Sequence, residues 1–513
     1  MHRVYSLVVD HEQTDVLIVG AGISGIGAAY HLQRQCPDRR YLIVEGRAAM
    51  GGTWDLFRYP GVRSDSDMQT LGYAFRPWRG RSSIAAGEDI LEYLHATAAE
   101  HGIDDKIRYG HWVSGASWSS DAVRWSVDIE RAEPRPGESR ALRVECKWLF
   151  ICTGYYDYEA GYTPDFEGVE DFTGRVVHPQ FWTDDIDYRE KRVVVIGSGA
   201  TAVTLVPALA QQAAKVTMLQ RSPTYYISMP AVDPIAKALE RLLPSDVAYR
   251  LARWKNIVMS YAMWKFCRTF PERARALLMR GVRERVGEVL DVDVHFNPHY
   301  APWDQRLCLV PDDDLFRAIR SGKAEVVTDH VERFTPRGIK LRGGDELEAD
   351  LIVTATGLSL KFLGGIALRV DGKPVEANDT WVYRGMMLSD VPNLSFATGY
   401  TNSSWTLKVD LTCSAVARLL DHMQSKGYTV AVPPRDDSLE QAPLLNLSSG
   451  YIARAVDRFP KQSTTDPWFV PQNYLRDLFT LKLARVEDGT LRFSRREPAA
   501  RRQAPVWPVK ASA

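Results

Sequence analysis

Two stretches of the chain share one order of apolar, glycine-rich and helix-forming positions. The first begins DVLIVGAGISG at residues 15–25, continues with the apolar, Ala-rich IGAAYHLQ, and ends with YLIVE, at Glu45. The second begins RVVVIGSGATA at residues 192–202, continues with VTLVPALAQQ, and ends with VTMLQR, at Arg221. This order predicts a strand, a tight turn, a helix and a second strand. Two such units predict an α/β fold with two Rossmann-like dinucleotide-binding domains.

The remaining pattern divides the chain further. The stretch between the second unit and residue 300 is mostly helical in pattern, and strands return at LIVTATG, residues 351–357. The final stretch is rich in Pro, Ala and Arg, which is typical of a disordered tail. We therefore expect four parts: the first part of one dinucleotide-binding domain over 1–155, a second dinucleotide-binding domain over 156–345 with a helical insertion over about 231–300, the second part of the first domain over 346–495, and a tail over 496–513.

Composition narrows the classes of partner. Lys and Arg together number 64, as do Asp and Glu, so the overall charge gives no reason to expect a nucleic acid as partner. Residues 237–285 depart from this balance, with 12 Lys and Arg against 4 Asp and Glu. A solvated helical face explains that excess, and a surface for acidic or membrane-bound partners is the alternative. The sequence does not indicate an oligomeric state.

The cysteines indicate a reducing compartment. The six cysteines are scattered and none forms a C-x-x-C pair, so neither a metal site nor a disulfide framework is expected. The N-terminal segment lacks the apolar core of a signal peptide. No apolar run approaches the roughly 18 residues that a transmembrane helix needs. We expect a cytoplasmic protein, and the basic segment leaves peripheral membrane contact open.

The first glycine-rich loop has the spacing of a phosphate-binding turn. Gly20, Gly22 and Gly25 would provide the tight turn, the close backbone approach to a pyrophosphate, and the close packing of helix on strand. Glu45 ends the second strand about 20 residues past the last glycine, where an acid accepts the ribose hydroxyls. A merely structural glycine turn is the alternative, and the terminal acid argues against it.

The second loop, Gly197-x-Gly199-x-x-Ala202, ends differently. The end of its second strand carries Arg221 and Ser222 in place of an acid. A carboxylate would repel a 2′-phosphate, whereas a guanidinium and a hydroxyl would bind it. This loop is therefore predicted to bind NADPH and not NADH. The alternative is that Arg221 is an ordinary surface arginine.

Two further segments carry a family resemblance. GGTWDLFRYPGVRSD, residues 51–65, and FTGRVVHPQFW, residues 172–182, resemble the fingerprints of type I Baeyer–Villiger flavin monooxygenases. N- and S-oxygenating flavin monooxygenases usually have Tyr or Phe where this chain has Trp182. Thr183 departs from the fingerprint, which normally continues with Pro or Asp. Outside these segments, QRSPTY, GYTNSSWTLK and NPHYAPWDQRLCLVPDDDLFRAIRSGKAEVVTDH resemble the subgroup of ethionamide-activating mycobacterial monooxygenases, which convert ketones to esters and oxygenate sulfur.

The resemblance implies a set of site residues. Its catalytic arginine corresponds to Arg306, with Asp65 close enough to orient it and also contacting the cofactor. Many relatives have a lysine where this chain has Gln305, so the 2′-phosphate should depend more heavily on Arg221. The expected FAD contacts are Ser24, Glu45, Thr53, Trp54, Asp55, Asp65 and Val113, and Gly52 and Leu56 complete the cofactor-binding segment. The expected NADP contacts are Arg63, Ser64, Asp65, Gly197, Ser198, Gly199, Ala200, Thr201, Ala202, Val203, Arg221 and Ser222.

The implied chemistry belongs largely to the flavin. NADPH would reduce FAD, and reduced FAD would add O2 to give a C4a-peroxyflavin that attacks a ketone carbonyl and yields an ester or lactone. Such a reaction needs a fixed cation beside the developing oxyanion, and arginine stays charged even when partly buried. The alternative for Arg306 is an ordinary ion pair between domains. His178 is either a hinge residue or a structural histidine, and we do not assign it a catalytic role.

Three other functions share parts of this pattern. An N- or S-oxygenating flavin monooxygenase would use the same cofactors without true Baeyer–Villiger activity. A flavin disulfide reductase would need a redox cysteine pair, and Cys146 and Cys152 have the wrong spacing. A non-enzymatic flavin sensor would need neither the second loop nor Arg221.

Overall fold

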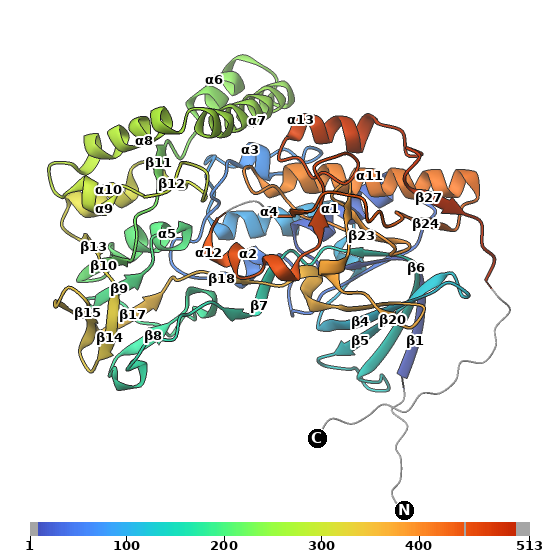
Figure 1. Cartoon of the computed structure of the whole chain (residues 1–513), viewed down its shortest axis with the longest axis horizontal. Helices are drawn as coiled ribbons and strands as arrows, with labels where there is room; N and C mark the ends of the chain where they lie inside the picture. The colour runs from blue at the N-terminus through green and yellow to red at the C-terminus, as the bar shows by residue number, and fades with distance from the viewer. Residues whose placement is uncertain (1–8, 446–447, 499–513) are drawn as a thin grey trace, which may run out of the picture.

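The computed structural model describes residues 9–445 and 448–498, which form two domains joined by two short crossings (Figure 1). Domain I contains the first glycine loop and domain II contains the second. The crossings are β7 (Tyr156–Gly161) and β18 (Leu358–Leu360), which pair antiparallel. Of the expected tail, residues 499–513 lie outside the described part of the chain.

Domain I is built around a large mixed sheet. In spatial order its strands are β20 (Lys373–Pro374), β19 (Ala367–Val370), β4 (His111–Ser119), β5 (Arg124–Arg131), β6 (Ala141–Ile151), β1 (Val9–Val19), β2 (Tyr41–Val44) and β3 (Ile107–Arg108), with β23 (Leu394–Phe396) also paired to β6. β1 runs parallel to both β2 and β6, and β4, β5 and β6 form an antiparallel meander. The apolar run at the end of β1 is buried on both sides. Its side chains on one face pack against the helices, and those on the other face pack in one cluster with side chains of β4 and β5.

The helices that cover domain I come from both ends of the chain. They are α1 (Ile23–Gln35), α4 (Gly87–Glu100) and α11 (Trp405–Lys426), and α1 packs directly on α11. Two short helices near the first loop are α2 (Thr53–Leu56) and α3 (Met68–Leu71). Trp405 Nε1 at the start of α11 donates a hydrogen bond to Ser24 Oγ in α1, 3.1 Å away. The C-terminal part of the chain therefore holds the first glycine loop in place.

Domain II is built around a parallel sheet. Its order is β13 (Ala324–Thr328), β10 (Lys215–Gln220), β9 (Arg192–Ile196), β17 (Leu351–Thr354) and β8 (Arg175–Val177). Helices α5 (Ala200–Leu209) and α10 (Asp314–Arg320) pack against it, as expected for a parallel sheet. β17 lies between β9 and β8, so the chain returns to domain I after Thr354, and not at the expected boundary after residue 345.

The predicted helical insertion consists of α6 (Pro234–Leu242), α7 (Ser245–Thr269), α8 (Pro271–Val286) and α9 (Val292–His295). Although the insertion belongs to domain II in sequence, α7 packs on α3 of domain I. Arg253 Nη1 donates hydrogen bonds to the carbonyl oxygens of Gln69 and Gly72, at 2.6 and 2.7 Å. Figure 1 shows α6 and α7 along the top of the molecule, above the junction of the domains. Within the described residues, no helix is long and apolar enough to span a bilayer.

Candidate active site

The first glycine loop turns as tightly as its spacing predicts. Gly20 has φ +103°, and a Cβ there would lie 2.7 Å from the carbonyl oxygen of Cys152. A Cβ on Gly25 would lie 1.9 Å from the Gly20 carbonyl oxygen, so only glycine lets the helix pack this closely on the loop. Gly22 faces the backbone of Gly52, with 3.5 Å between its Cβ position and the Gly52 Cα. The two segments pack backbone against backbone, and both line a cavity between the domains.

Glu45 lies directly after β2, at the predicted strand end. Its Oε2 accepts the N–H of Ala21 at 2.8 Å, and its Oε1 accepts the N–H of Arg47 at 2.9 Å. Burial raises the pKa of Glu45, and the two backbone N–H groups oppose that shift. The carboxylate lines the cavity beside the first loop, where it can accept a ribose hydroxyl.

Some predicted residues of the segment after Glu45 line the cavity, and others lie behind its wall. Thr53 and Trp54 line the cavity, as does Val113 in β4. Asp55 does not line it, because its buried carboxylate is paired with Arg47 and Arg58. The predicted residues that lie behind the cavity wall are Gly25, Asp55, Leu56, Ser64, Ala202 and Val203. These residues support the loops and do not face the cavity.

The second loop makes the same tight turn, and the space in front of its glycines is more open. Gly197 has φ +134°, and a Cβ there would lie 2.3 Å from the Ala355 carbonyl oxygen. A Cβ on Gly199 would meet no described atom within 4 Å, so this glycine opens directly on space that a ligand can fill. Ser198 Oγ donates to the Ser222 carbonyl oxygen at 3.1 Å, which ties the loop to the strand end. Ala200 and Thr201, at the start of α5, also line the cavity.

Arg221 follows the last residue of β10 and lines the cavity beside this loop. It is exposed and makes no ion pair with any described residue. Gln305 lies in the same cavity wall and adds no charge. A free guanidinium beside an open glycine turn suits the 2′-phosphate of NADPH.

The two catalytic candidates meet at the domain junction. Arg306 Nη2 lies 3.3 Å from Asp65 Oδ1, and both residues line the cavity. The Asp65 carboxylate raises the pKa of Arg306, and burial opposes that effect only in part. Arg63, two residues before Asp65, pairs with Asp314 of α10, so this segment of domain I is held against domain II. A fixed, permanently charged guanidinium therefore projects into the cavity.

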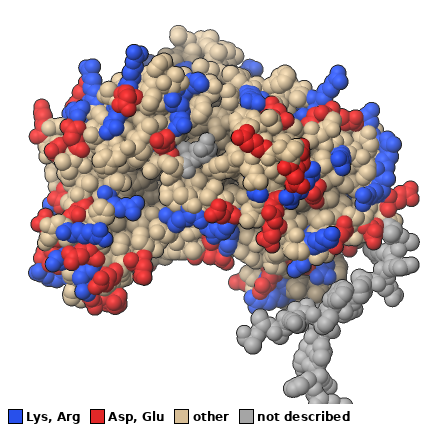
Figure 2. All heavy atoms as spheres, viewed as in Figure 1, with Lys and Arg blue, Asp and Glu red and all other residues tan. Residues whose placement is uncertain are grey.

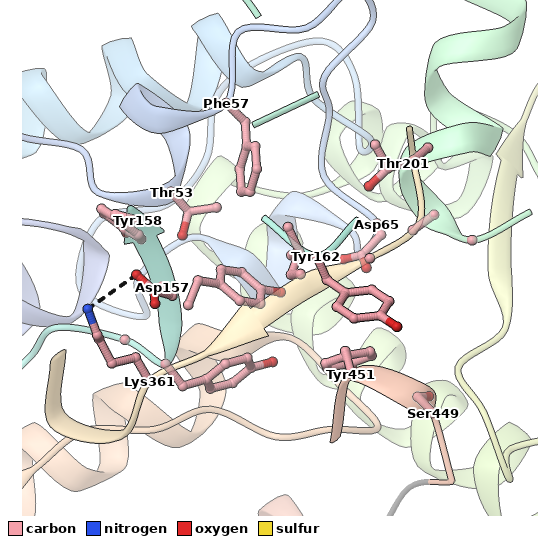
Figure 3. Close-up of a pocket in the computed structure, with 18 of the residues that line it drawn as sticks. Thr53, Phe57, Asp65, Asp157, Tyr158, Tyr162, Thr201, Lys361, Ser449 and Tyr451 are labelled. Atoms are coloured by element: carbon pink, nitrogen blue, oxygen red, sulfur yellow. Dashed lines mark ion pairs between the residues drawn. The ribbon is translucent and has the colours of Figure 1, made fainter. Parts of the chain in front are cut away.

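Sequence reasoning missed the aromatic wall around Arg306. Tyr155, Tyr156, Tyr162 and Tyr451 line the cavity, and Figure 3 shows Tyr162 and Tyr451 lying near Asp65. The ring of Tyr155 lies 4.9 Å from that of Trp405, centroid to centroid. Burial raises the pKa of Tyr155 and Tyr156, so both phenols stay protonated. The signal was present, because residues 154–162 read GYYDYEAGY.

His178 lies near the crossings between the domains and is held by two hydrogen bonds to the backbone. Its Nδ1 accepts the N–H of Gln180 at 3.2 Å, so its Nε2 carries the proton and donates to the Gly357 carbonyl oxygen at 3.0 Å. Burial lowers the pKa of His178, which favours this neutral form. His178 is absent from the cavity wall.

The parts described above border one continuous cavity of about 860 Å³ between the domains. Both glycine loops, Glu45, Arg221 and Arg306 line it. Such a volume is in the range of cofactor and substrate sites. Within the described residues, no group of His, Cys, Asp and Glu could hold a metal ion.

Comparison with known proteins identifies the family. Residues 14–252 match the family model described as pyridine nucleotide-disulphide oxidoreductase. The FAD-containing monooxygenase EthA of Mycobacterium tuberculosis (strain ATCC 25618 / H37Rv) is 53% identical over 487 residues, which covers 94% of this chain and 98% of the relative. EthA of Mycolicibacterium smegmatis (strain ATCC 700084 / mc(2)155) is 48% identical over 490 residues, which covers 95% and 98%. The chain belongs to the FAD-containing monooxygenases.

Solved structures of more distant monooxygenases share the fold. An oxidised steroid monooxygenase bound to NADP matches with a TM-score of 0.74 at 22% identity, covering 94% of this chain and 99% of that one. A cyclohexanone-bound cyclohexanone monooxygenase in the rotated conformation matches with a TM-score of 0.68 at 18% identity, covering 82% and 89%. The predicted fold of two dinucleotide-binding domains is confirmed.

The residues of this FAD-containing monooxygenase fit its flavin. Gly22 and Gly52 expose backbone in the cavity wall, which suits a pyrophosphate, and the buried Glu45 carboxylate lies in the same wall. The second loop, with the open Gly199 and the unpaired Arg221, fits NADPH in the same way. FAD and NADPH therefore each have a site that opens on the cavity containing Arg306.

Proposed function

We propose that the protein is a Baeyer–Villiger monooxygenase. It inserts one oxygen atom of O2 next to a ketone carbonyl to give an ester or lactone, with NADPH as the electron donor, and it also oxygenates sulfides or thioamides. The observation that carries this proposal is the position of Arg306, held by Asp65 at 3.3 Å in the wall of the cavity that both glycine loops border.

The two loops assign the cofactors to opposite sides of the cavity. The first loop and Glu45 hold FAD, and the second loop with Arg221 holds NADPH. When bound, FAD supplies a ring that accepts electrons and activates O2, and NADPH supplies the hydride. The chain itself binds, orients and shields these groups.

Arg306 supplies the charge that a ketone reaction needs. Nucleophilic addition to a carbonyl places negative charge on the carbonyl oxygen, and a fixed cation lowers the energy of that state. Asp65 keeps the guanidinium charged and restricts its orientation. Asp65 is thus a positioning residue as well as a cofactor contact.

The aromatic wall keeps water away from the reacting atoms. Tyr155 and Tyr156 are packed ring against ring, with centroids 4.8 Å apart, and their phenols stay protonated. Low water content strengthens the field of Arg306 and protects the activated oxygen from release as peroxide. Protonated phenols can also donate hydrogen bonds to a substrate oxygen.

A disulfide reductase is disfavoured by the cysteines. All six are free and buried, including Cys152, which lines the cavity. Burial raises the pKa of Cys152 and of Cys413, whereas redox cysteines need a stabilised thiolate. Six free cysteines also support our proposal that the enzyme works in the reducing cytoplasm.

The test supplies the enzyme with NADPH, ¹⁸O2 and a panel of ketones of increasing chain length, together with one dialkyl sulfide. Mass spectrometry should find esters or lactones that carry a single heavy oxygen, and labelled sulfoxide from the sulfide. Sulfoxide without ester across the whole ketone panel would reassign the protein to the sulfur-oxygenating monooxygenases. If the hydrogen peroxide formed accounted for all of the NADPH consumed, both ketone and sulfide oxygenation would be excluded.

A further inference from the structure

Helix α7 exposes a row of apolar side chains. The row consists of Val247, Leu251, Trp254 and Val258, all exposed and spaced three or four residues apart. This spacing places them on one face of the helix. The opposite face is buried on α3 through Arg253 and Tyr249, so the exposed row is not the packing face of α7.

A second row lies beside the first, on the helical segment near the C-terminus. It consists of Leu475 in α13 (Tyr474–Asp477) and of Phe479 and Leu483 in η7 (Leu478–Leu483), of which the last two are 64% and 66% exposed. Trp254 of α7 and Tyr474 of α13 are in edge-to-face contact, with ring centroids 5.9 Å apart. Segments more than 200 residues apart in the chain thus expose apolar rows side by side.

Helix α6 extends the same surface. Leu242 is 80% exposed and Ile235 is also exposed, and α6 is fixed to α7 by the ion pair between Lys255 and Asp233. Figure 1 shows α6, α7 and α13 along the upper edge of the molecule, and Figure 2 shows that the crest there is largely free of charged side chains. We call the two rows together with Ile235 and Leu242 the apolar ridge.

Positive charge borders the apolar ridge. Lys237 and Arg241 of α6, Lys265 of α7 and Lys482 of η7 make no ion pair with any described residue, and they outnumber the one unpaired acid of α6, Glu240. This unpaired charge accounts for part of the excess of 12 Lys and Arg over 4 Asp and Glu in residues 237–285. Apolar side chains flanked by unpaired cations are the composition that binds anionic lipid surfaces.

We propose that the apolar ridge docks the enzyme on the surface of an anionic phospholipid bilayer. The apolar rows enter the interface between headgroups and acyl chains, Trp254 lies at headgroup depth, and the unpaired cations face the lipid phosphates. A second copy of the chain is the competing occupant. A two-fold dimer would place the same positive border against itself, and like charges oppose that contact.

The docked orientation brings the bilayer close to the active site. The side of α7 opposite the apolar ridge binds α3, and Leu71 at the end of α3 lines the cavity. Substrates dissolved in the bilayer would therefore reach the enzyme near its cavity. Docking itself does not depend on the reaction proposed above, because no residue of the apolar ridge lines the cavity.

The test measures co-flotation of the full-length holoenzyme with vesicles. One set contains phosphatidylcholine alone and the other contains equal parts of phosphatidylcholine and phosphatidylglycerol. The wild-type protein should bind the mixed vesicles, and added salt should weaken that binding. The double variant Val258→Glu with Phe479→Glu should bind the mixed vesicles at least about tenfold less tightly.

A matched control separates docking from a general charge effect. Val289→Glu combined with Val294→Glu changes two exposed valines outside the apolar ridge, adds the same two negative charges, and should bind like the wild type. Both variants should keep the wild-type rate of NADPH oxidation without vesicles, which shows that they are folded. Absence of vesicle binding by the wild type, or equal binding by wild type and double variant, would overturn the proposal. A wild-type dimer in sedimentation velocity that the double variant loses, without vesicle binding, would assign the apolar ridge to self-association instead.

Discussion

Arg306 and Asp65 stand 241 positions apart in the sequence, and yet Nη2 of one lies 3.3 Å from Oδ1 of the other in the cavity between the domains. Asp65 belongs to domain I, and Arg306 precedes β12 (Cys308–Pro311) in domain II. The pair therefore exists only when the two domains are closed on each other. It couples the placement of the proposed catalytic charge, Arg306, to the assembly of the two domains that carry the glycine loops.

Arg221 should determine the preference for NADPH. Arg221→Ala removes the unpaired guanidinium beside the second loop, so the KM for NADPH should rise at least about tenfold while the KM for NADH changes little. Steady-state kinetics with both coenzymes measure this. Gln305→Lys is the complementary variant, because it adds a cation to the same wall and should lower the KM for NADPH. An equal loss for both coenzymes in Arg221→Ala would contradict the assignment.

The two glycine loops should respond differently to the same substitution. Gly25→Ala places a Cβ 1.9 Å from a backbone oxygen, which should destabilise the protein by about 1–3 kcal/mol and reduce its flavin content. Gly199→Ala meets no described atom within 4 Å and should leave the unfolding temperature and flavin content unchanged. It should instead raise the KM for NADPH by narrowing the second groove. Loss of flavin in Gly199→Ala would reverse the assignment of the loops.

A buried ion pair supports the wall around Tyr400. Lys408 Nζ in α11 lies 2.7 Å from Asp477 Oδ2, both side chains are almost fully buried, and Tyr400 donates to the same carboxylate oxygen. Lys408→Met leaves that carboxylate without its cation and should cost about 3–5 kcal/mol of unfolding free energy in urea titrations. Lys408→Met combined with Asp477→Leu should recover much of the loss. Arg192→Met, which breaks exposed pairs with Glu348 and Asp350, should change stability much less.

His178 should contribute to loss of stability in acid. Because its pKa is lowered from the ordinary value of 6.5, the unfolded chain takes up the proton more readily than the folded protein. Neutral His178 contributes its full stabilisation at pH values above 6.5. This stabilisation is lost as the pH falls from 6.5 through the lowered pKa. His178→Gln keeps a donor for Gly357 and cannot be protonated, so its unfolding free energy should fall less between about pH 8 and about pH 5. Parallel curves for wild type and variant would assign the acid sensitivity to other groups.

The sequence predicted those helices, strands and turns that depend on neighbouring residues in the chain. Strand, turn and helix at each loop follow from a few consecutive residues, and β2 and β10 end one residue before the predicted strand ends at Glu45 and Arg221. The pairing of Asp65 with Arg306 was expected from family resemblance and not from periodicity. Contacts across the domain junction depend on how two separate sheets face each other, which no local pattern specifies.

The missed residues illustrate this limit. Tyr451 reaches the cavity from the C-terminal part of the chain, about 300 residues from Tyr155, and only the closed fold brings them together. The second crossing after Thr354 was misplaced because β17 is a short buried strand whose apolar run gives no indication of which sheet it joins. The contact of α7 with domain I depends on Arg253, whose sequence context resembles an ordinary solvated helix.

The most direct test of the central claim uses the variant Arg306→Ala. Rapid mixing measures the reduction of its flavin, and product analysis measures its yield of ester. Anaerobic NADPH should still bleach its flavin at a rate close to that of the wild type, because both nucleotide loops are intact. In the presence of O2 and a ketone, its yield of ester per NADPH should fall at least about 100-fold, with hydrogen peroxide formed instead. Arg306→Lys, which keeps a positive charge without the planar fork, should retain part of the yield. An undiminished ester yield from Arg306→Ala would contradict the central role of the Arg306–Asp65 pair.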